Sequence, residues 1–276
     1  MTNGEPATLG SKHWEIKRLR TLLRDASARA ADFAFVLEGP KIIEDALRRG
    51  ATLDAVFIGP GARQSFSALL HHPGMADVAV FELKEGVLEK LGSTRTPQPV
   101  LAVATIPPRP TIASLTGPGP VLVAVGVADP GNLGTLLRSA EASGAAGVVC
   151  CGASVDVYNP KVVRASAGAV FGLPVVADRI AGKDPEADAV AALEALSAAG
   201  RTRYGAALGG TPATELDLTG PIALVLGNEA RGLSESVRSR IDGLISIPMA
   251  GAGESLNVAM AGTLLAFEAA RQRAAR

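Results

Sequence analysis

Residues 223–262 read ALVLGNEARGLSESVRSRIDGLISIPMAGAGESLNVAMAG, and this stretch decides the fold class. Two short apolar runs, residues 222–226 and 244–247, each lead directly into a polar, glycine-rich loop. Short apolar runs bounded by Gly and Pro are typical of central strands in a parallel sheet. Loops that leave the carboxyl ends of such strands are where α/β proteins usually build binding sites. The stretch therefore predicts an α/β fold with a small-molecule pocket.

The composition of the whole chain bounds its class. A length of 276 residues suffices for two domains, each with its own core, and an apolar share of 47% is ordinary for a folded protein. The formal net charge is +0, so any binding of nucleic acid must rest on a local patch. No run approaches the roughly 20 apolar residues that a membrane span needs, and the polar N-terminus carries no signal-peptide core.

The two cysteines of the chain, Cys150 and Cys151, stand side by side at the end of an apolar run. Neighbours in sequence rarely form a disulfide, and no Cys/His spacing suits zinc. We therefore expect buried, reduced thiols, no metal and a cytoplasmic protein.

Residues 1–107 predict a compact α/β domain. Residues 1–10 are small and polar, and we expect them to be disordered. A helix over residues 15–29 is followed by strands and helices in alternation. The expected strands are 33–37, 53–58, 78–81 and 100–104, and the expected helices are 41–49, 63–70 and 84–91. His71 and His72 precede a Pro-Gly turn and are expected to be exposed loop residues.

The first expected helix has an apolar face and a basic surface. Ile16, Leu19, Leu22 and Leu23 recur at helical spacing and predict the buried face. The other positions and the residues just before the helix carry six cations against two acids, namely Lys12, Lys17, Arg18, Arg20, Arg24 and Arg29 against Glu15 and Asp25. Such a charge run is either a solvated helix face or a phosphate-contacting patch, and the sequence alone leaves both open.

A Pro- and Gly-rich linker over residues 108–119 separates this domain from a second one over residues 120–276. The expected strands of the second domain are 121–127, 147–151 and 203–207 besides the two in the opening stretch. Its expected helices are 133–142, 160–168, 188–199 and 256–273. The last of these is apolar on nearly every side up to Glu268, which predicts burial against a second subunit.

Few polar residues stand in the glycine-rich loops and just behind them. They are Asn132, Arg138, Asn228, Glu229, Arg231, Glu254, Ser255 and Asn257. The absence of a Ser–His–Asp set or metal cluster disfavours hydrolysis. The loop GVADPGNLG lacks the G-x-G-x-x-G spacing, and no acid closes the following strand, so a nicotinamide oxidoreductase is disfavoured too. Taken singly, Arg138 suits a surface helix, and Ser255 and Asn257 suit helix N-caps.

Taken together, three blocks resemble the SpoU/TrmH branch of the SPOUT methyltransferases. The blocks are residues 129–134 with Arg138, residues 226–233, and residues 247–249 with residues 255–259. This resemblance covers residues 117–276. The N-terminal part resembles the ribosomal-protein-L30e-like substrate-binding domain of larger family members, with residues 35–39 as its best match. The resemblance implies an RNA ribose 2′-O-methyltransferase that uses S-adenosylmethionine.

The resemblance also assigns roles to residues. The implied catalytic set is Asn132, Arg138, Glu229, Ser255 and Asn257. The implied cofactor cradle is Leu208, Gly209, Leu226, Gly227, Asn228, Glu229, Ile247, Pro248, Met249, Ser255, Leu256 and Asn257. Arg138 is implied to activate the ribose hydroxyl, although a guanidinium is almost always protonated. It acts either as a transiently neutral base or as a charged group that stabilises the developing alkoxide.

The fold and partners implied by the resemblance are a C-terminal trefoil knot around the parallel sheet and a homodimer formed through the knotted domain. The implied RNA contacts are Lys17, Arg18, Arg20, Lys161 and Arg164. Ribosomal RNA, in particular 23S, is the favoured substrate. Transfer RNA and a catalytically inactive RNA-binding protein are the alternatives. The modified nucleotide, and the choice between a housekeeping and an antibiotic-resistance role, stay open.

Overall fold

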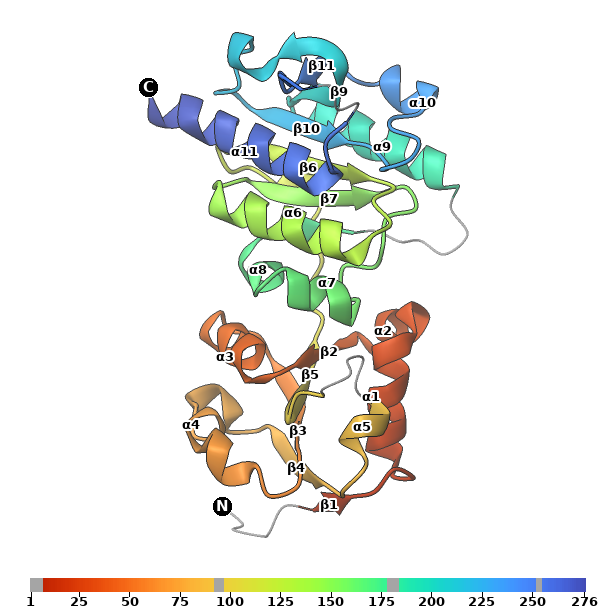
Figure 1. Cartoon of the computed structure of the whole chain (residues 1–276), viewed down its shortest axis with the longest axis vertical. Helices are drawn as coiled ribbons and strands as arrows, with labels where there is room; N and C mark the ends of the chain where they lie inside the picture. Colours follow the sequence, from red (N-terminus) through yellow and green to blue (C-terminus); the bar gives the residue numbers. More distant parts are fainter. Residues whose placement is uncertain (1–6, 92–96, 178–183, 252–254) are drawn as a thin grey trace. The chain divides into compact units, whose positions relative to one another are not determined.

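The structure is a computed structural model that describes residues 7–91, 97–177, 184–251 and 255–276 (Figure 1). It divides into two compact units. The first comprises Met1–Pro108 with Tyr158–Arg164, and the second comprises Arg109–Val157 with Ala165–Arg276. Of the residues expected to be disordered, 1–6 lie outside the described part of the chain. No helix in the described ranges is long and apolar enough to cross a membrane.

The first unit is built on a mixed five-stranded sheet with the order β1-β4-β3-β5-β2. Strand β5 runs antiparallel to β2 and β3, and β4 runs parallel to β1 and β3. The strands are β1 (Thr8–Leu9), β2 (Ala34–Glu38), β3 (Leu53–Ile58), β4 (Ala79–Leu83) and β5 (Val100–Thr105). The helices are α1 (Trp14–Arg24), α2 (Ala26–Asp32), α3 (Pro40–Arg48), α4 (Ser67–Leu70) and α5 (Leu88–Leu91), with 3-10 turns η1 (Arg63–Phe66) and η2 (Pro73–Met75).

Three local expectations for the first unit were wrong. The helix expected over 15–29 breaks at Asp25, whose carboxylate accepts a hydrogen bond from the Ser27 N–H at 2.8 Å and caps α2. Residues 8–9 are ordered as a strand that pairs with β4, because Leu9 is buried in the core. The helix expected over 84–91 keeps only the single α-helical turn α5, whereas the one expected over 63–70 is helical throughout, as the 3-10 turn η1 followed by α4.

The second unit is built on a six-stranded sheet, and every strand pair in it is parallel, as predicted. The order is β11-β9-β10-β6-β7-β8. The strands are β6 (Val121–Val125), β7 (Gly147–Cys151), β8 (Val175–Val176), β9 (Thr202–Pro212), β10 (Ile222–Leu226) and β11 (Gly243–Ser246). The helices are α6 (Pro130–Ala142), α8 (Ala169–Gly172), α9 (Pro185–Ala198), α10 (Glu235–Arg238) and α11 (Val258–Ala274), with 3-10 turns η3 (Ile112–Ser114) and η4 (Ala213–Glu215). Between α6 and α8 in the sequence, α7 (Pro160–Ala165) groups with the first unit up to Arg164.

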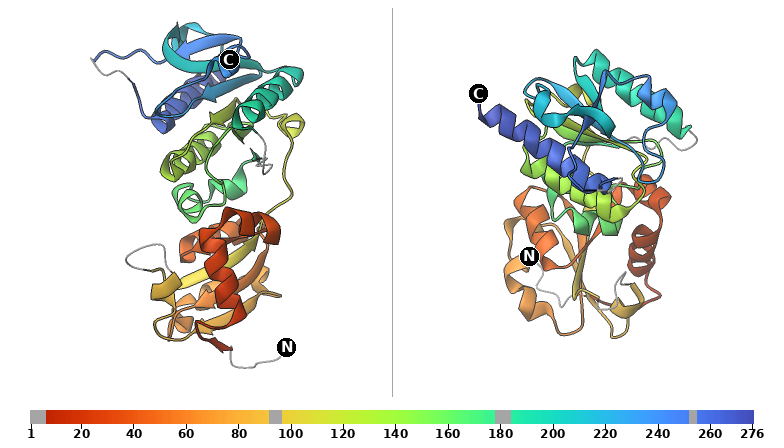
Figure 2. Two further views of the ribbon diagram at one scale, coloured as in Figure 1. Left: turned by 90° about the vertical axis from the view of Figure 1, so that its right-hand side faces the viewer. Right: turned by 45° about the horizontal axis from the view of Figure 1, so that its top comes forward.

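Helices α6 and α11 lie side by side on one face of this sheet, and α9 covers the opposite face (Figure 2). The close approach of α11 depends on Gly262, because a Cβ there would collide with Leu136 of α6 and lie 2.7 Å from Leu226 of β10. The hydroxyls of Ser139 and Thr263 also join the two helices at 2.7 Å. The trefoil knot implied by the resemblance stays a prediction.

The segment expected as a linker is fastened to the second unit. The buried Arg201 guanidinium donates to the carbonyl oxygens of Leu115 at 2.5 Å, Gly117 at 3.1 Å, Gly119 at 3.1 Å and Ile222 at 3.2 Å. Burial lowers the pKa of Arg201. Residues 115–119 are therefore held against the rest of the second unit by the side chain of Arg201.

The thiols of Cys150 and Cys151 are free and buried on β7, as expected. Burial raises the pKa of Cys150 to about 12 and also raises the pKa of Cys151. Such thiols are poor nucleophiles, so they belong to the core rather than to a reactive site. Among the described residues, no group of three or more His, Cys, Asp or Glu side chains is placed to hold a metal.

Candidate active site

Asn132 stands in the first turn of α6, just beyond the carboxyl end of β6. Asp129 is the N-cap, since its Oδ1 accepts a hydrogen bond from the Asn132 N–H at 2.8 Å, and Pro130 follows at the first helical position. The helix expected over 133–142 therefore begins three residues earlier, at Pro130. This arrangement fixes where the Asn132 side chain leaves the backbone.

The loop after β10 is closed tightly by Asn228 and Gly232. Their backbone groups exchange two hydrogen bonds, at 3.1 and 2.9 Å. The Asn228 side chain accepts from the N–H groups of Ala230 at 3.0 Å and Arg231 at 3.2 Å, and it donates to the Gly126 carbonyl at 2.8 Å. A Cβ on Gly227 would lie 2.5 Å from the Gly232 backbone, so Gly227 permits loop closure. The closed loop holds Glu229 exposed at its tip.

Three of the predicted catalytic residues meet in one hydrogen-bonded network. Asn132 Nδ2 donates to Glu229 Oε1 at 2.8 Å, and Asn257 Nδ2 donates to Asn132 Oδ1 at 2.9 Å. These bonds join residues 97 and 125 positions apart in the sequence. Asn257 also caps α11, because its Oδ1 accepts from the N–H groups of Ala259 at 2.9 Å and Met260 at 3.3 Å. The cap interpretation of Asn257 is therefore correct, and its role in a site stays a prediction.

Two predicted catalytic residues do not join this network. Arg138 is exposed on α6, about 9 Å along the helix axis from Asn132 and roughly 120° around it. Within the described part of the chain its guanidinium has no hydrogen-bond or ion-pair partner. Ser255 is exposed, and the cap of α11 is Asn257 instead. Glu254 lies outside the described residues.

The predicted cofactor residues sit toward the carboxyl ends of the neighbouring strands β9, β10 and β11. Leu244 pairs with Gly205, whereas the next residue, Ile245, pairs with Thr211, so residues 206–210 of β9 bulge out of the ladder. Leu208 lies in this bulge and exposes 61% of its surface. Gly209 has φ 72°, a left-handed conformation that favours glycine. An exposed leucine on a shaped bulge gives a ligand an apolar surface.

The chemistry of these residues fits S-adenosylmethionine. Leu256 is an exposed apolar side chain, and Ile247 and Met249 are half-buried. The backbone N–H groups of Met249 and Leu256 donate to no acceptor within the described ranges. Apolar side chains together with unused backbone donors are what an adenine ring requires. The side chain of Leu226 is buried in the core, so only its backbone is left for a ligand.

The predicted RNA contacts fall into two groups. Lys17 and Lys161 are exposed, and Arg20 is half-buried. Arg18 donates to Asp32 at 2.6 Å and to Asp54 at 3.0 Å, and Arg164 pairs with Glu38 at 3.8 Å. Arg29, expected on the basic surface, is buried and donates to the Leu22 carbonyl at 2.6 Å. The first group remains available for phosphates, whereas the second already has protein partners.

The sequence did not predict that the side chains of Asp129 and Asn228 bind backbone groups. The Asp129–Pro130 pair is itself a helix-start signal from which the cap was predictable. No comparable local signal marks Asn228, because its hydrogen-bond partners, Gly126 and Gly232, come close to it only in the folded structure.

A parallel sheet with a hydrogen-bonded polar set at its carboxyl edge is the usual arrangement of a ligand site in an α/β protein. Residues 119–267 match the SpoU rRNA Methylase family, and residues 14–102 match the MRM3-like substrate binding domain. The chain belongs to the SpoU rRNA methylase family.

Known relatives match either most of the chain or about half of it. The chain is 30% identical over 257 residues to the 23S rRNA (guanosine(2553)-2'-O)-methyltransferase RlmP of Bacillus subtilis, which covers 93% of this chain and 94% of that protein. It is 43% identical over 148 residues to the 23S rRNA (uridine(2479)-2'-O)-methyltransferase of Streptomyces viridochromogenes, a match that spans 52% of this chain and about half, 50%, of that relative.

Solved structures extend the likeness to both units. The SpoU methyltransferase AviRb from Streptomyces viridochromogenes, in complex with AdoMet, superposes with a TM-score of 0.80 at 29% identity over 96% of this chain and 100% of that one. An AdoMet-bound rRNA methyltransferase from Sinorhizobium meliloti superposes with a TM-score of 0.79 at 27% identity over 97% of this chain and 98% of that one. The family and the α/β fold predicted from the three blocks are thereby confirmed.

Proposed function

We propose that the chain transfers the methyl group of S-adenosylmethionine to the 2′-hydroxyl of a ribose in 23S ribosomal RNA. The observation that carries the proposal is the Asn132–Glu229–Asn257 network, which gathers three distant segments at the sheet edge where the cofactor residues lie. The names of the relatives favour ribosomal over transfer RNA. The hydrogen-bonded state of all three residues argues against a decayed, inactive protein.

The reaction is a direct displacement. The ribose oxygen forms a bond to the methyl carbon as the sulfur–carbon bond breaks, and the hydroxyl proton leaves. S-adenosylmethionine supplies the activated methyl group and, on transfer, its sulfonium becomes a neutral thioether. The protein must align the two partners at about 3–3.5 Å and give the proton a path. No metal is needed for this chemistry.

Within the site, Asn257 orients Asn132, and Asn132 orients the Glu229 carboxylate. Glu229 Oε1 is occupied by this contact, whereas Oε2 has only a long 3.5 Å contact with Asn228 Nδ2. Oε2 is therefore open to a donor from the ribose or from the methionine moiety. This makes Glu229 the positioning carboxylate of the proposed site.

Arg138 acts in this proposal as a charged group rather than as a neutral base. Within the described part of the chain, the Arg138 guanidinium has no hydrogen-bond or ion-pair partner. An unpaired guanidinium suits an RNA phosphate or a developing alkoxide. The proton of the ribose hydroxyl then passes to a water molecule.

The test combines calorimetry with mapping of the modification. Wild-type protein should bind S-adenosylmethionine saturably and NAD not at all. RNA from cells with and without the protein should differ by one 2′-O-methyl site in 23S RNA. Arg138→Ala should abolish methyl transfer while cofactor binding survives. A variant that turns over near the wild-type rate would remove Arg138 from the mechanism, and wild-type protein that does not bind the cofactor would refute the proposed function.

The homodimer is a further part of the proposal. Met260, Leu264 and Phe267 expose 61%, 50% and 46% of their surfaces in one stripe of α11. Three large apolar side chains on one helix face favour coverage by a second copy. Sedimentation should show a dimer for the wild type and a monomer for Leu264→Glu. A monomeric wild type would contradict this assignment.

Three other expectations stand as proposals. We assign RNA binding to residues 1–107 and methyl transfer to residues 120–276, joined by residues 108–119. We retain Lys17, Arg20 and Lys161 as RNA contacts, and we place Arg18 and Arg164 second, because their carboxylate partners must be displaced first. A cytoplasmic location is consistent with the free, buried cysteines.

A further inference from the structure

Trp14 is the one tryptophan of the sequence, and it is exposed. It begins α1 and leaves 63% of its surface uncovered. Tryptophan is a largely buried residue type on average, so this exposure needs a reason. The ring is not loose on the surface. His13 caps α1 by accepting the Glu15 N–H at 3.3 Å, and its ring centre lies 5.9 Å from that of Trp14 at a tilt of 32°.

Trp14 heads a stripe of exposed residues on α1. Trp14, Lys17, Thr21 and Arg24 follow one another at intervals of three and four residues, and all four are exposed. Lys12 is exposed just before the helix, and Arg20 is half-buried at the edge of the stripe. We call these six residues the α1 stripe. From Trp14 to Arg24 it extends about 15 Å along the helix.

The cations of the α1 stripe differ from Arg18 of the same helix in that they lack ion-pair partners. Lys12, Lys17, Arg20 and Arg24 form no ion pair with any carboxylate in the described part of the chain. By contrast, Arg18 is held by Asp32 and Asp54. The acid of α1, Glu15, is buried away from the stripe. The stripe therefore combines four positive charges that have no carboxylate partner with one exposed aromatic ring.

This combination suits an unpaired nucleic-acid strand. Cations along a surface follow the phosphates, and an exposed aromatic ring stacks on a base that is not paired. A second copy of this chain is a poor occupant, because a two-fold contact would set the four cations against their own copies. A duplex is also a poor occupant, because its bases are already stacked on each other.

We propose that Trp14 stacks on an unpaired base of the RNA substrate while Lys12, Lys17, Arg20 and Arg24 hold the phosphates of the same strand. The inference rests on the proposed function and adds to it the residue that selects single-stranded RNA. The formal net charge of +0 is compatible with this proposal, because the positive charges are gathered on the α1 stripe.

The fluorescence of the protein tests this directly, because all tryptophan emission comes from Trp14. The full chain is titrated, without S-adenosylmethionine, with a single-stranded oligouridylate, with an RNA duplex of equal length and with polyglutamate. Saturable quenching by the single strand and weak quenching by the other two are expected. Equal quenching by polyglutamate would show that any polyanion suffices, and preference for the duplex would exclude stacking on an unpaired base.

Substitutions supply the second readout, with binding measured by the anisotropy of labelled oligouridylate. Trp14→Ala should weaken binding about tenfold or more, and Trp14→Phe should retain most of it, since a phenyl ring still stacks. Phe33→Ala is the matched control, because Phe33 is equally exposed at 62% but lies outside the stripe. Wild-type affinity in Trp14→Ala, or an equal loss in Phe33→Ala, would overturn the inference.

Methyl transfer separates this inference from the proposed function. If Trp14 is quenched by the single strand but the wild type transfers no methyl group to RNA, the proposed reaction fails and the stacking contact stands. If the wild type methylates 23S RNA and Trp14→Ala does so with an unchanged KM, the reaction stands and the stacking contact fails.

Discussion

The polar groups at the sheet edge of the second unit and the cations on α1 of the first unit are organised in opposite ways. At the sheet edge, the side chains of Asn132, Glu229 and Asn257 are bonded to one another. On the α1 stripe, Lys17 and Arg24 have no carboxylate partner within the described residues. The first arrangement fixes positions, and the second leaves charge free for a ligand.

This difference predicts what substitutions do. A group with internal partners supports the fold or the geometry of the site, so its loss should change stability or turnover. A group without partners supports only binding, so its loss should change affinity and leave stability and turnover intact. Four variants test this contrast, and they are ordered by the size of the expected effect.

Arg201→Met should have the largest effect, on stability. Methionine fills much of the space of the arginine side chain but cannot donate hydrogen bonds. The four carbonyl groups that Arg201 binds in the second unit would therefore lose their donors. We expect the free energy of unfolding, measured in urea, to fall by about 3 kcal/mol or more. The control is Arg240→Met, whose exposed pair with Glu194 at 3.0 Å should contribute less than about 1 kcal/mol. Equal effects of the two variants would contradict the inference that Arg201 holds residues 115–119 against the second unit.

Asn132→Ala should act on turnover rather than on stability. It removes both the donor to Glu229 and the acceptor of Asn257, so the carboxylate loses its orientation. We expect kcat for methyl transfer to fall about 100-fold, the size of effect that small misplacements cause. Thr135→Ala, one turn further along α6, is the control and should leave kcat unchanged. An unaltered kcat in Asn132→Ala would mean that the network is structural only.

The sequence predicted the strands around the candidate site well because its signals are local. The apolar run 222–226 matches β10 residue for residue, and the run 147–151 matches β7. The run 244–247 is shifted by one residue from β11, which spans Gly243–Ser246. Apolar strands bounded by Gly and Pro can be located from the chain alone, since burial and turn chemistry act on neighbouring residues.

The parts that the sequence did not predict depend on contacts between distant residues. The bulge at 206–210 exists because β11 pairs on both sides of it, so a strand expected over 203–207 runs to Pro212. The saturation of Arg201 by carbonyl groups, and of Arg18 by Asp32 and Asp54, likewise needs segments that only the fold brings together. Side-chain partners, unlike strand positions, are a property of the assembled structure.

The double variant Lys17→Ala/Arg24→Ala should affect RNA binding alone. Each lost phosphate contact on a single strand should reduce the slope of log affinity against log salt by about 0.7, so the pair should reduce it by about 1.4. The free energy of unfolding and kcat should not change, since neither cation has an internal partner among the described residues. Lys41→Ala/Arg63→Ala, two exposed cations on other elements of the first unit, is the matched control. An equal change of slope in both double variants would remove the α1 stripe from RNA binding.

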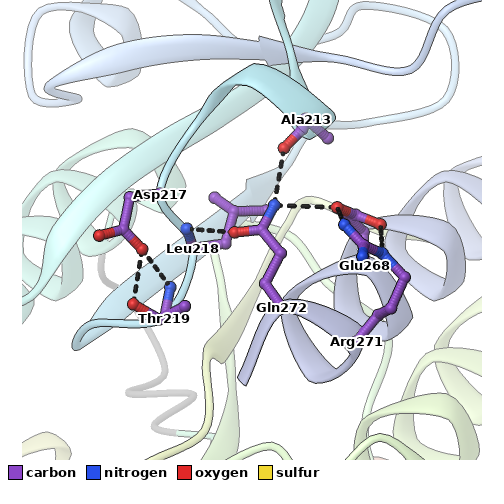
Figure 3. A network of polar contacts seen from close by, with 7 residues as sticks. All are labelled: Ala213, Asp217, Leu218, Thr219, Glu268, Arg271 and Gln272. Atoms are coloured by element: carbon purple, nitrogen blue, oxygen red, sulfur yellow. Dashed lines mark hydrogen bonds and ion pairs between the residues drawn. The ribbon is translucent and has the colours of Figure 1, made fainter. Parts of the chain in front are cut away.

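The smallest expected effect concerns the C-terminal end of α11, where the carboxylate of Glu268 accepts hydrogen bonds from neighbouring side chains (Figure 3). Arg271 donates two hydrogen bonds to the Glu268 carboxylate, at 2.9 and 2.8 Å, and Gln272 donates a third at 2.9 Å. Gln272 in turn donates to the Ala213 carbonyl at 3.1 Å and accepts the Leu218 N–H at 2.9 Å. The helix that presents Asn257 to the site is thus tied at its other end to the segment between β9 and β10.

These donors, Arg271 first and then Gln272, lower the pKa of Glu268 to about 2. A carboxylate whose pKa is lower in the folded than in the unfolded state stabilises the fold above its unfolded pKa, and this contribution disappears as the pH falls toward the folded value. Glu268→Gln should therefore be less stable than the wild type at pH 7 by less than about 1 kcal/mol, because Arg271 is exposed and solvent screens the pair. The deficit should shrink between pH 4.5 and about 2. A deficit that is the same at pH 7 and pH 3 would mean that the hydrogen bonds of Gln272, and not the charge of Glu268, hold the end of α11.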